Sequence, residues 1–139
     1  MSCKVIGIIG ESNVGKTTTL NELFDKLKEL NATVVENKQQ VGNDERDFSC
    51  VFSFHEKKIA IFTMGDVVKY LKTAFKTYSP CDYLICAISN DVLNRKTMTL
   101  PDNRELFYII RDEKDAEKSI VRKEKREDVI NKVLSSITY

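Results

Sequence analysis

The sequence predicts an α/β protein of three layers, in which helices cover both faces of a mainly parallel β-sheet that includes one antiparallel hairpin strand. Three observations lead to this fold class. Short apolar runs alternate along the chain with amphipathic segments, an order typical of parallel sheets. Most of these runs lack polar alternation, as expected of strands that are buried on both faces. Two strand-like runs are separated by only three residues, which indicates a hairpin.

The chain has the length of one domain and almost no net charge. Its 139 residues fit a single domain over 1–139, since most domains have about 100–150 residues. The 22 basic and 21 acidic side chains leave a formal charge of +1, so no overall field attracts nucleic acid or an anionic membrane. No apolar run reaches the roughly 20 residues of a membrane span. We therefore expect a cytoplasmic protein with no nucleic-acid or membrane partner.

The first elements are a strand, a helix and a second strand. Residues 4–9 form a short apolar run, and residues 32–35 form another. Between them, apolar residues recur at the i, i+3, i+4 and i+7 positions of a helix face; they are Leu20, Leu23, Phe24 and Leu27. We expect the two strands to be parallel, because a helix connects them. The polar residues 36–47 are predicted to form a mobile loop.

The middle of the chain predicts a hairpin followed by a helix. Residues 48–54 and 58–64 are the two β-rich runs. The second is apolar enough to lie near the centre of the sheet. A helical pattern then extends from Val67 to Tyr78 and ends before Pro80.

The last part of the chain adds two strands and a helix. Residues 83–88 and 106–110 are apolar runs that predict strands. Residues 111–128 mix acidic and basic side chains, which is typical of a solvated helix face. A terminal helix is expected from an apolar face made of Ile130, Val133, Leu134 and Ile137.

The four cysteines do not have the spacing of a metal site. Cys3, Cys50, Cys81 and Cys86 form no Cys-x-x-Cys pair, and the sequence has a single histidine, His55. We therefore expect buried free thiols in a reducing cytosol, and neither a zinc site nor a disulfide framework.

The loop after the first strand matches the pattern G-x-x-x-x-G-K-[ST] from Gly10 to Thr17. Glycines permit backbone angles that let successive N–H groups surround phosphate oxygens. Lys16 adds a charge for the β- and γ-phosphates, Thr17 offers a hydroxyl to Mg²⁺, and the following helix directs its positive end at the same anion. At average residue frequencies, a chain of this length shows the pattern by chance roughly five times in a thousand. The predicted nucleotide-binding residues are Gly10, Glu11, Ser12, Asn13, Val14, Gly15, Lys16, Thr17 and Thr18.

On these residues, the segment 4–30 resembles the Walker A unit of the P-loop NTPase superfamily. The resemblance implies a three-layer P-loop NTPase fold with a Mg²⁺–nucleotide site at the carboxyl ends of the parallel strands. The arrangement of the remaining elements is similar to the small kinase-like or MobB-like accessory members. Glu11 departs from what the phosphate site favours, since a carboxylate repels phosphate unless it faces solvent or metal.

A second acidic group near the P-loop hydroxyl usually completes a magnesium–nucleotide site. Asp66 is the best candidate, because it follows the apolar run that ends the hairpin, and Gly65 would let the backbone approach a phosphate. However, Thr63, Met64 and Gly65 separate Asp66 from the apolar residues 59–62 of that run. Asp66 is equally suited to cap the next helix, and the two roles are compatible.

Other charged residues have weaker claims on the site. Glu36 and Asp91 lie at strand ends and could position metal, water or substrate, although ordinary loop positions explain them better. The polar segment 89–104 carries Arg95, Lys96 and Arg104, and such a segment could close over phosphates as a basic lid or be a plain solvated loop. Arg46 has a similar but weaker case.

The base-specific motif of Ras-type GTPases, Asn/Thr-Lys-x-Asp, has no match. Residues 37–40 place glutamine at the discriminating position, and residues 111–115 do not fit either. ATP is therefore the default nucleotide, with GTP less favoured.

Two functions remain open, with a third less favoured. The first is an ATP-binding enzyme, an ATPase or small-molecule kinase, that transfers the γ-phosphoryl group to water or to a small acceptor with Mg²⁺. Its catalytic residues would be Lys16, Asp66 and Arg95, with Thr17 and Asp66 at the metal. The alternative is a nucleotide-dependent switch or accessory binding module with negligible turnover, whose ordered loops would present a surface to a protein partner. An eroded domain that binds phosphate without catalysis is the third.

Overall fold

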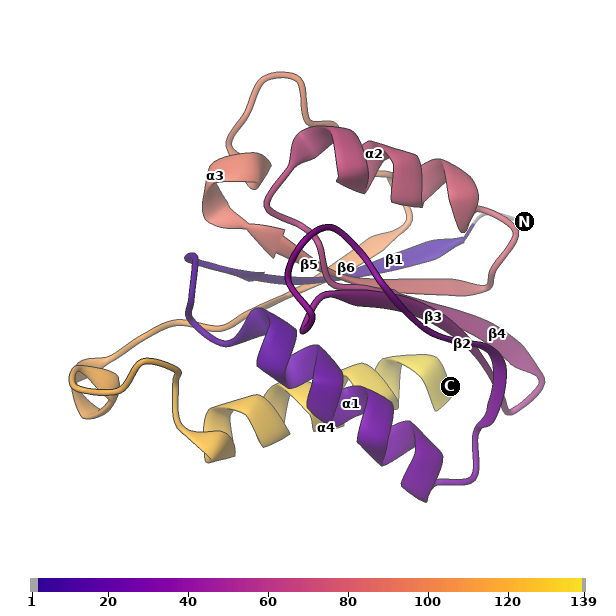
Figure 1. Cartoon of the computed structure of the whole chain (residues 1–139), viewed down its shortest axis with the longest axis horizontal. Helices are drawn as coiled ribbons and strands as arrows, with labels where there is room; N and C mark the ends of the chain where they lie inside the picture. Colours follow the sequence, from indigo (N-terminus) through magenta and orange to yellow (C-terminus); the bar gives the residue numbers. More distant parts are fainter. Residues whose placement is uncertain (1–2, 139) are drawn as a thin grey trace.

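The computed structural model of the chain describes residues 3–138. A six-stranded β-sheet in the order β2-β3-β4-β5-β1-β6 runs through the centre of the molecule (Figure 1). The strands are β1 (Lys4–Gly10), β2 (Thr33–Gln40), β3 (Phe48–Phe54), β4 (Lys57–Phe62), β5 (Tyr83–Ser89) and β6 (Arg104–Tyr108). The helices are α1 (Lys16–Glu29), α2 (Val68–Thr77), α3 (Asn90–Leu93) and α4 (Lys123–Thr138), with a short 3₁₀ turn, η1 (Glu113–Asp115).

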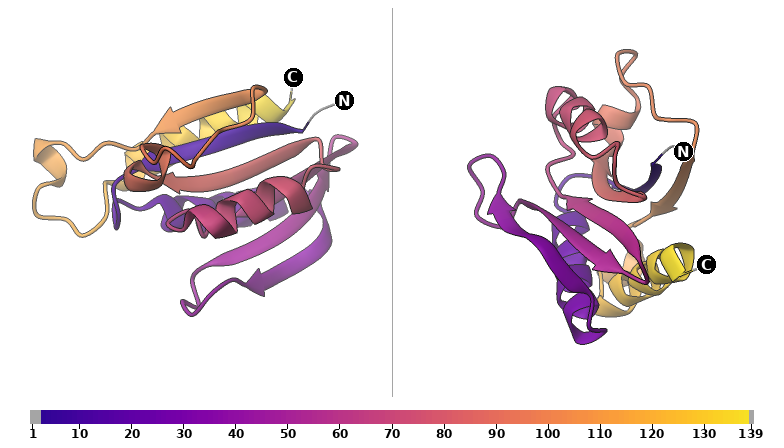
Figure 2. Two further views of the ribbon diagram at one scale, coloured as in Figure 1. Left: turned by 90° about the horizontal axis from the view of Figure 1, so that it is seen from above. Right: turned by 90° about the vertical axis from the view of Figure 1, so that its right-hand side faces the viewer.

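Helices cover both faces of the sheet, which confirms the three-layer α/β fold. Helices α1 and α4 lie on one face, and α2 and α3 lie on the other (Figures 1 and 2). Each face has its own apolar core. Leu23 of α1 and Ile130 of α4 pack with the sheet on the first face, whereas Leu71 of α2 packs with Ile88 on the second. The inner strands are buried on both sides, as their uninterrupted apolar runs predict.

The pairing of β2 differs from the prediction. Strands β4, β5, β1 and β6 are parallel to one another, and the predicted hairpin of β3 and β4 is present. However, β2 pairs with β3 in antiparallel fashion at the edge of the sheet and has no contact with β1 in the ladder. The prediction of a parallel β1–β2 pair was wrong because β5 and β6 occupy both sides of β1. The connecting helix fixes only the direction of β2, not its neighbour.

Strand β2 is also longer than expected. It extends to Gln40, so residues 36–40, predicted as loop, are strand, and only residues 41–47 form the connection to β3. All eight residues of β2 are exposed. The polar sequence therefore marks an edge strand, which lacks the uninterrupted apolar run of an inner strand.

The carboxyl ends of the parallel strands meet at one edge of the sheet. Gly10 at the end of β1 lies opposite Ser89 at the end of β5. Beyond β4, Gly65 crosses toward β5, and the Ser89 amide donates to the Gly65 carbonyl over 3.2 Å. A Cβ atom on Gly65 would lie 1.5 Å from the Ala87 carbonyl oxygen, so only glycine fits. Gly65 thus approaches neighbouring backbone, and this crossing brings Asp66 to the same edge as the P-loop.

The polar segment 89–104, for which the sequence left a basic lid and a solvated loop open, contributes two residues to the core. Val92 and Met98 from this segment are buried in the core between the sheet and α2. Arg104 begins β6 and lies opposite Val5, near the start of β1. At about 3.3 Å per residue, this position is about 16 Å from Gly10. Arg104, one of the three basic residues considered for a lid, therefore lies at the far edge of the sheet, because β6 pairs in parallel with β1.

The charged residues 111–128 are not simply a solvated helix face. The Asp115 side chain is fully buried, and it pairs with Arg122 Nε at 3.2 Å and Lys125 Nζ at 2.5 Å. Burial would raise the pKa of the Asp115 carboxyl, but hydrogen bonds from Lys125, Arg122 and Asp112 hold it well below its usual range. The Arg111 guanidinium donates to the carbonyls of Asp115 and Ser119. These ion pairs and hydrogen bonds join residues of the loop that links β6 to α4, so they stabilise the conformation of that loop.

The prediction of buried thiols holds for Cys50, Cys81 and Cys86, whereas Cys3 is half-buried. All four cysteines are free, and three of them are buried. Burial raises the pKa of Cys86 and of Cys50 to about 12. Within residues 3–138, no three His, Cys, Asp or Glu side chains group closely enough to hold a metal ion by themselves, and no helix is long and apolar enough to cross a membrane.

Substitution Asp115→Asn is expected to lower the melting temperature by about 5 °C or more, since it leaves two cations beside a neutral amide. The depressed pKa in the folded state stabilises the fold above the unfolded carboxyl pKa of about 3.9, and this contribution is lost as the pH falls below that value. The deficit should therefore be present in thermal melts at pH 7 and smaller at pH 3. Asp128→Asn, which breaks an exposed pair with Lys132, is the control. Equal melting of the two variants at pH 7 would contradict the assignment.

Candidate nucleotide-binding site

The turn between β1 and α1 has the backbone geometry of an anion-binding loop. Asn13 and Gly15 adopt positive φ angles of 64° and 117°, which point successive N–H groups to the inside of the turn. Gly15 is the N-cap of α1, and no side chain caps its first turn. Free N–H groups and the positive end of the helix dipole therefore face the same point.

Close packing explains why the two motif glycines are needed. A Cβ atom on Gly10 would lie 2.7 Å from Val14 and 3.0 Å from the Ile109 carbonyl oxygen. A Cβ atom on Gly15 would lie 2.6 Å from Ile120, and the backbone angle there already disfavours a side chain. The Val121 amide donates to the Val14 carbonyl over 3.1 Å. The loop that contains the Asp115 network is thus packed directly against the P-loop.

Lys16 is 6% exposed and lies across the P-loop. Its ammonium donates to the carbonyls of Gly10 at 2.9 Å and Glu11 at 2.6 Å. Burial holds the pKa of Lys16 below its usual value. The nearby carboxylates of Asp66 and Glu11 oppose this shift only in part. Because an ammonium has three donors, two contacts orient it and one remains for a phosphate oxygen.

A carboxylate that the sequence analysis overlooked contacts the P-loop hydroxyl. Thr17 Oγ1 donates to Asp47 Oδ1 over 3.2 Å, and Thr63 Oγ1 donates to the same oxygen over 2.8 Å. Thr63 in turn accepts a hydrogen bond from the Phe48 amide at 2.8 Å. The start of β3 and the end of β4 therefore hold Asp47 against the first turn of α1.

The position of Asp47 follows from the hairpin. Because β3 runs antiparallel to β4, the residue before β3 lies at the edge where the parallel strands end. A predicted antiparallel strand was therefore the signal that could have indicated Asp47. Hydroxyl and carboxylate oxygens are ligands that Mg²⁺ prefers, so Thr17 and Asp47 suit a magnesium ion that also binds phosphate.

Asp66 is exposed and lines the same cavity, as predicted from its position after the hairpin. It does not cap α2, since the N-cap of that helix is Val67 and no side-chain hydrogen bond is made there. Of the two roles that the sequence left open for Asp66, capping of α2 is therefore excluded. It is not part of the hydrogen-bonded group of Asp47, Thr17 and Thr63.

The loop of residues 41–47 borders the site on one side. Asn21 of α1 donates to the carbonyls of Thr17 at 2.9 Å and Arg46 at 3.2 Å, which ties this loop to the P-loop helix. Arg46 Nη2 pairs with Asp44 at 2.9 Å. Hydrogen bonds from Arg46 hold the pKa of the Asp44 carboxyl below its usual range. The loop thus has a fixed backbone and carries a charged pair at its tip.

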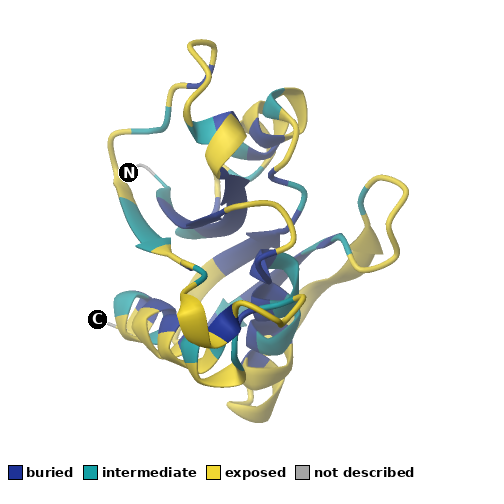
Figure 3. Cartoon of the chain, turned by 90° about the vertical axis from the view of Figure 1, so that its left-hand side faces the viewer, coloured by how far each residue is buried: buried dark blue, intermediate teal, exposed yellow. Residues whose placement is uncertain are grey.

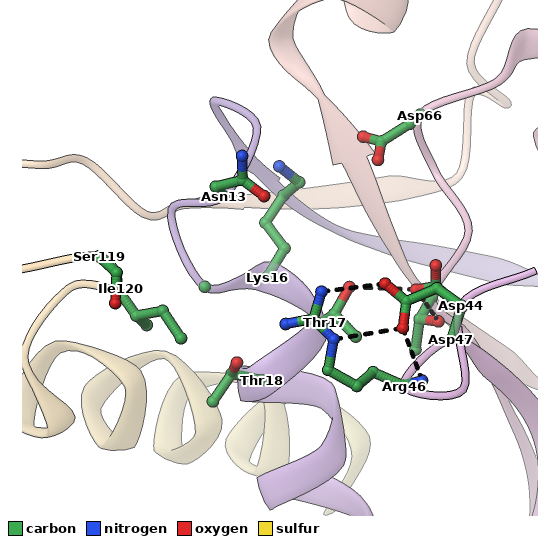
Figure 4. A pocket seen from close by; sticks show the side chains of 12 residues that line it. Asn13, Lys16, Thr17, Thr18, Asp44, Arg46, Asp47, Asp66, Ser119 and Ile120 are labelled. Atoms are coloured by element: carbon green, nitrogen blue, oxygen red, sulfur yellow. Dashed lines mark hydrogen bonds and ion pairs between the residues drawn. The ribbon is translucent and has the colours of Figure 1, made fainter.

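These elements enclose a cavity of about 480 Å³ (Figure 4). Seen from the P-loop edge, the strand ends are buried and the surrounding loops are exposed (Figure 3). The residues that line the cavity are Asn13, Gly15, Lys16, Thr17, Thr18, Asp44, Arg46, Asp47, Thr63, Asp66, Ser119 and Ile120.

Some of the residues predicted for the nucleotide site do not line this cavity. Gly10, Glu11, Ser12 and Val14 do not line the cavity. Glu11 is exposed, as a carboxylate beside phosphate should be, and Val14 is buried in the core. Arg95 follows α3 on the other side of the sheet and does not line the cavity, and neither do Glu36 and Asp91. Sequence analysis missed Asp44, Asp47, Thr63, Ser119 and Ile120, which come from loops with no recognised motif.

The parallel sheet, the P-loop between β1 and α1, and the edge cavity together define a P-loop NTPase. A comparison with protein families identifies the group more closely: the model described as 50S ribosome-binding GTPase matches residues 5–130. The chain therefore belongs to this GTPase family. No curated protein matches the chain. The family points to GTP, whereas the sequence alone favoured ATP.

Substitution Lys16→Ala should weaken nucleotide binding at least tenfold while the fold remains intact, because one charge-assisted phosphate contact contributes about 1.5–3 kcal/mol. Calorimetric titration with nucleotide and Mg²⁺ measures the change. Lys26→Ala, on the exposed side of α1, is the matched control. Equal affinities of wild type and Lys16→Ala would refute the phosphate site.

Substitutions Thr17→Val and Asp47→Asn should weaken binding mainly when Mg²⁺ is present, because both remove an oxygen suited to the metal. Titrations in Mg²⁺ and in EDTA separate this effect from a loss of phosphate contact. Thr73→Val, on the exposed face of α2, should leave both affinities unchanged. An equal loss in EDTA would remove the metal role of these residues.

Proposed function

We propose that this chain binds a Mg²⁺–nucleoside triphosphate in the edge cavity and hydrolyses its γ-phosphate, with loop 41–47 responding to the nucleotide as a switch. The observation that carries the proposal is the contact between Thr17 of the P-loop and Asp47 of that loop. A metal ion bound by the Thr17 hydroxyl would lie beside the Asp47 carboxylate and attract it, so metal binding would act directly on the loop that carries Asp47. Phosphate chemistry and loop position are therefore linked through one side chain.

Water is the acceptor that we assign. The oxygen of a water molecule attacks the γ-phosphorus, a new P–O bond forms, and the bond to the β–γ bridging oxygen breaks to leave a nucleoside diphosphate and phosphate. The proton of the attacking water goes to the phosphate product or to solvent. The cavity of about 480 Å³ lies within the range of about 300 to 1,000 Å³ that is usual for small-molecule sites.

The residues of the chain act mainly by position and charge. The N–H groups of the P-loop and the Lys16 ammonium stabilise the negative charge that develops on the phosphate oxygens. Bound Mg²⁺ would supply Lewis-acid polarisation of the same oxygens. Asp66, exposed at the cavity wall, is our candidate to orient the attacking water. Arg95 is not part of the proposal, because it does not line the cavity.

GTP is the nucleotide that family membership favours, and ATP is the second candidate. One observation supports ATP: Asp115, which would be the aspartate of an Asn/Thr-Lys-x-Asp motif placed at residues 112–115, is fully buried and paired with Arg122 and Lys125. A carboxylate held in this way has no free oxygen to receive the hydrogen bonds of a guanine base. The description of the family refers to the ribosome. A formal charge of +1 gives this chain no overall attraction to RNA, so our proposal covers only the nucleotide chemistry.

Phosphate release from purified protein with Mg²⁺–GTP and with Mg²⁺–ATP tests this function, alongside binding of each nucleotide by calorimetry. We expect binding of at least one triphosphate and slow release of phosphate that Lys16→Ala abolishes. Release of equal rate from wild type and Lys16→Ala would indicate a contaminating enzyme and contradict the proposal. Binding without release would leave the switch function and refute the hydrolase function.

A further inference from the structure

Arg46 is placed to reach the phosphates of a nucleotide in the cavity. Its side chain lines the cavity beside Thr17 (Figure 4). Its backbone carbonyl is fixed by Asn21, and the next residue, Asp47, contacts Thr17. The Arg46 side chain is 70% exposed. The loop therefore holds the base of the side chain firmly beside the P-loop while the charged end remains free to change partners.

The present partner of the guanidinium is a neighbour in the same loop. Arg46 donates through Nε to Asp44 Oδ1 at 3.2 Å and through Nη2 to Asp44 Oδ2 at 2.9 Å. The Arg46 amide also donates to Asp44 Oδ1 at 2.9 Å. Exposed ion pairs of this kind contribute little to stability. A phosphate group presents the same fork geometry with more negative charge, so it competes well for the guanidinium.

The charges that line the cavity favour a change in which Arg46 exchanges Asp44 for a phosphate group. Among the described residues that line it, Asp44, Asp47 and Asp66 are carboxylates, whereas Lys16 and Arg46 are the two cations. A triphosphate that enters this cavity brings further negative charge. With Arg46 paired to Asp44, Lys16 is the one cation of the lining that is directed at the P-loop.

We propose that Arg46 leaves Asp44 to bind the γ-phosphate of a bound nucleoside triphosphate, so that loop 41–47 supplies a catalytic arginine from within the chain. This inference rests on the proposed function and adds a residue to the same site. Asp44 holds the guanidinium when no γ-phosphate competes for it. The arginine therefore distinguishes a triphosphate from a diphosphate, and during hydrolysis it stabilises charge on the transferred phosphoryl group.

The test compares affinities for a non-hydrolysable triphosphate and for the diphosphate of the same base, each with Mg²⁺, in wild type and in variants of this loop. Arg46→Ala should reduce the preference for triphosphate at least tenfold while affinity for diphosphate changes less than threefold. Arg46→Lys should restore part of that preference, since one ammonium replaces a two-pronged contact. Glu45→Gln, an exposed substitution in the same loop, is the matched control. Thermal melting checks that each variant is folded.

Asp44→Asn supplies a second, independent readout. Freeing the guanidinium should tighten triphosphate binding two- to tenfold in the wild-type background and have no effect in the Arg46→Ala background. An unchanged triphosphate preference in Arg46→Ala, or an Asp44→Asn effect of equal size in both backgrounds, would overturn the role of Arg46 alone. If the wild type binds neither nucleotide, the proposed function itself fails, and that outcome is distinguishable because it needs no variant.

Discussion

The site depends on the tight turn between β1 and α1. Gly10 and Gly15 are packed so closely against Val14, Ile109 and Ile120 that neither position has room for a side chain. This packing fixes the path of the loop, and the path fixes where the amide groups and Lys16 point. An anion site made of backbone N–H groups needs no further specific side chains to exist. The remaining elements of the fold decide what else meets the phosphates there.

Two loops meet the P-loop from opposite sides, and each has its own anchor. The loop after β6 is shaped by the buried Asp115 pairs and touches the P-loop through the Val121 amide. The loop before β3 is held by Asn21 and by the Thr17–Asp47 hydrogen bond. The first loop has a buried ionic network, whereas the second has an exposed ion pair at its tip. This difference in burial explains why we assign the switching role to residues 41–47.

Much of the fold could be predicted from the sequence, because most helices and strands have a recognisable pattern of apolar and polar residues. Uninterrupted apolar runs located the inner strands, helical spacing located α1 and α2, and a motif of eight residues located the P-loop. The neighbours of β1 could not be predicted, since any of several strands satisfies the same pattern. The sequence of β2 was misjudged for a related reason: an edge strand that is exposed on every residue looks like a polar loop.

The candidate site was predictable only where a motif or a strand end pointed to it. Lys16 and Thr17 have fixed places in the P-loop, and Asp66 follows an apolar run. Asp47 lies in a polar loop whose composition carries no signal, and Arg46 of the same loop was only a weak candidate. The place of both residues depends on the antiparallel direction of β3. Arg95 was a candidate catalytic residue because it follows the carboxyl end of β5. It lies on the other face of the sheet because α3 and the segment after it pack with α2.

A crystal structure with Mg²⁺ and a non-hydrolysable nucleoside triphosphate tests the central claim most directly, which is that the P-loop turn holds the phosphates next to the Thr17–Asp47 pair. The account predicts β- and γ-phosphates between Lys16 and the first turn of α1, and a magnesium ion at the Thr17 hydroxyl with Asp47 in direct or water-mediated contact. A nucleotide bound at another place on the protein, or phosphates in the P-loop with the metal remote from Thr17, would contradict it.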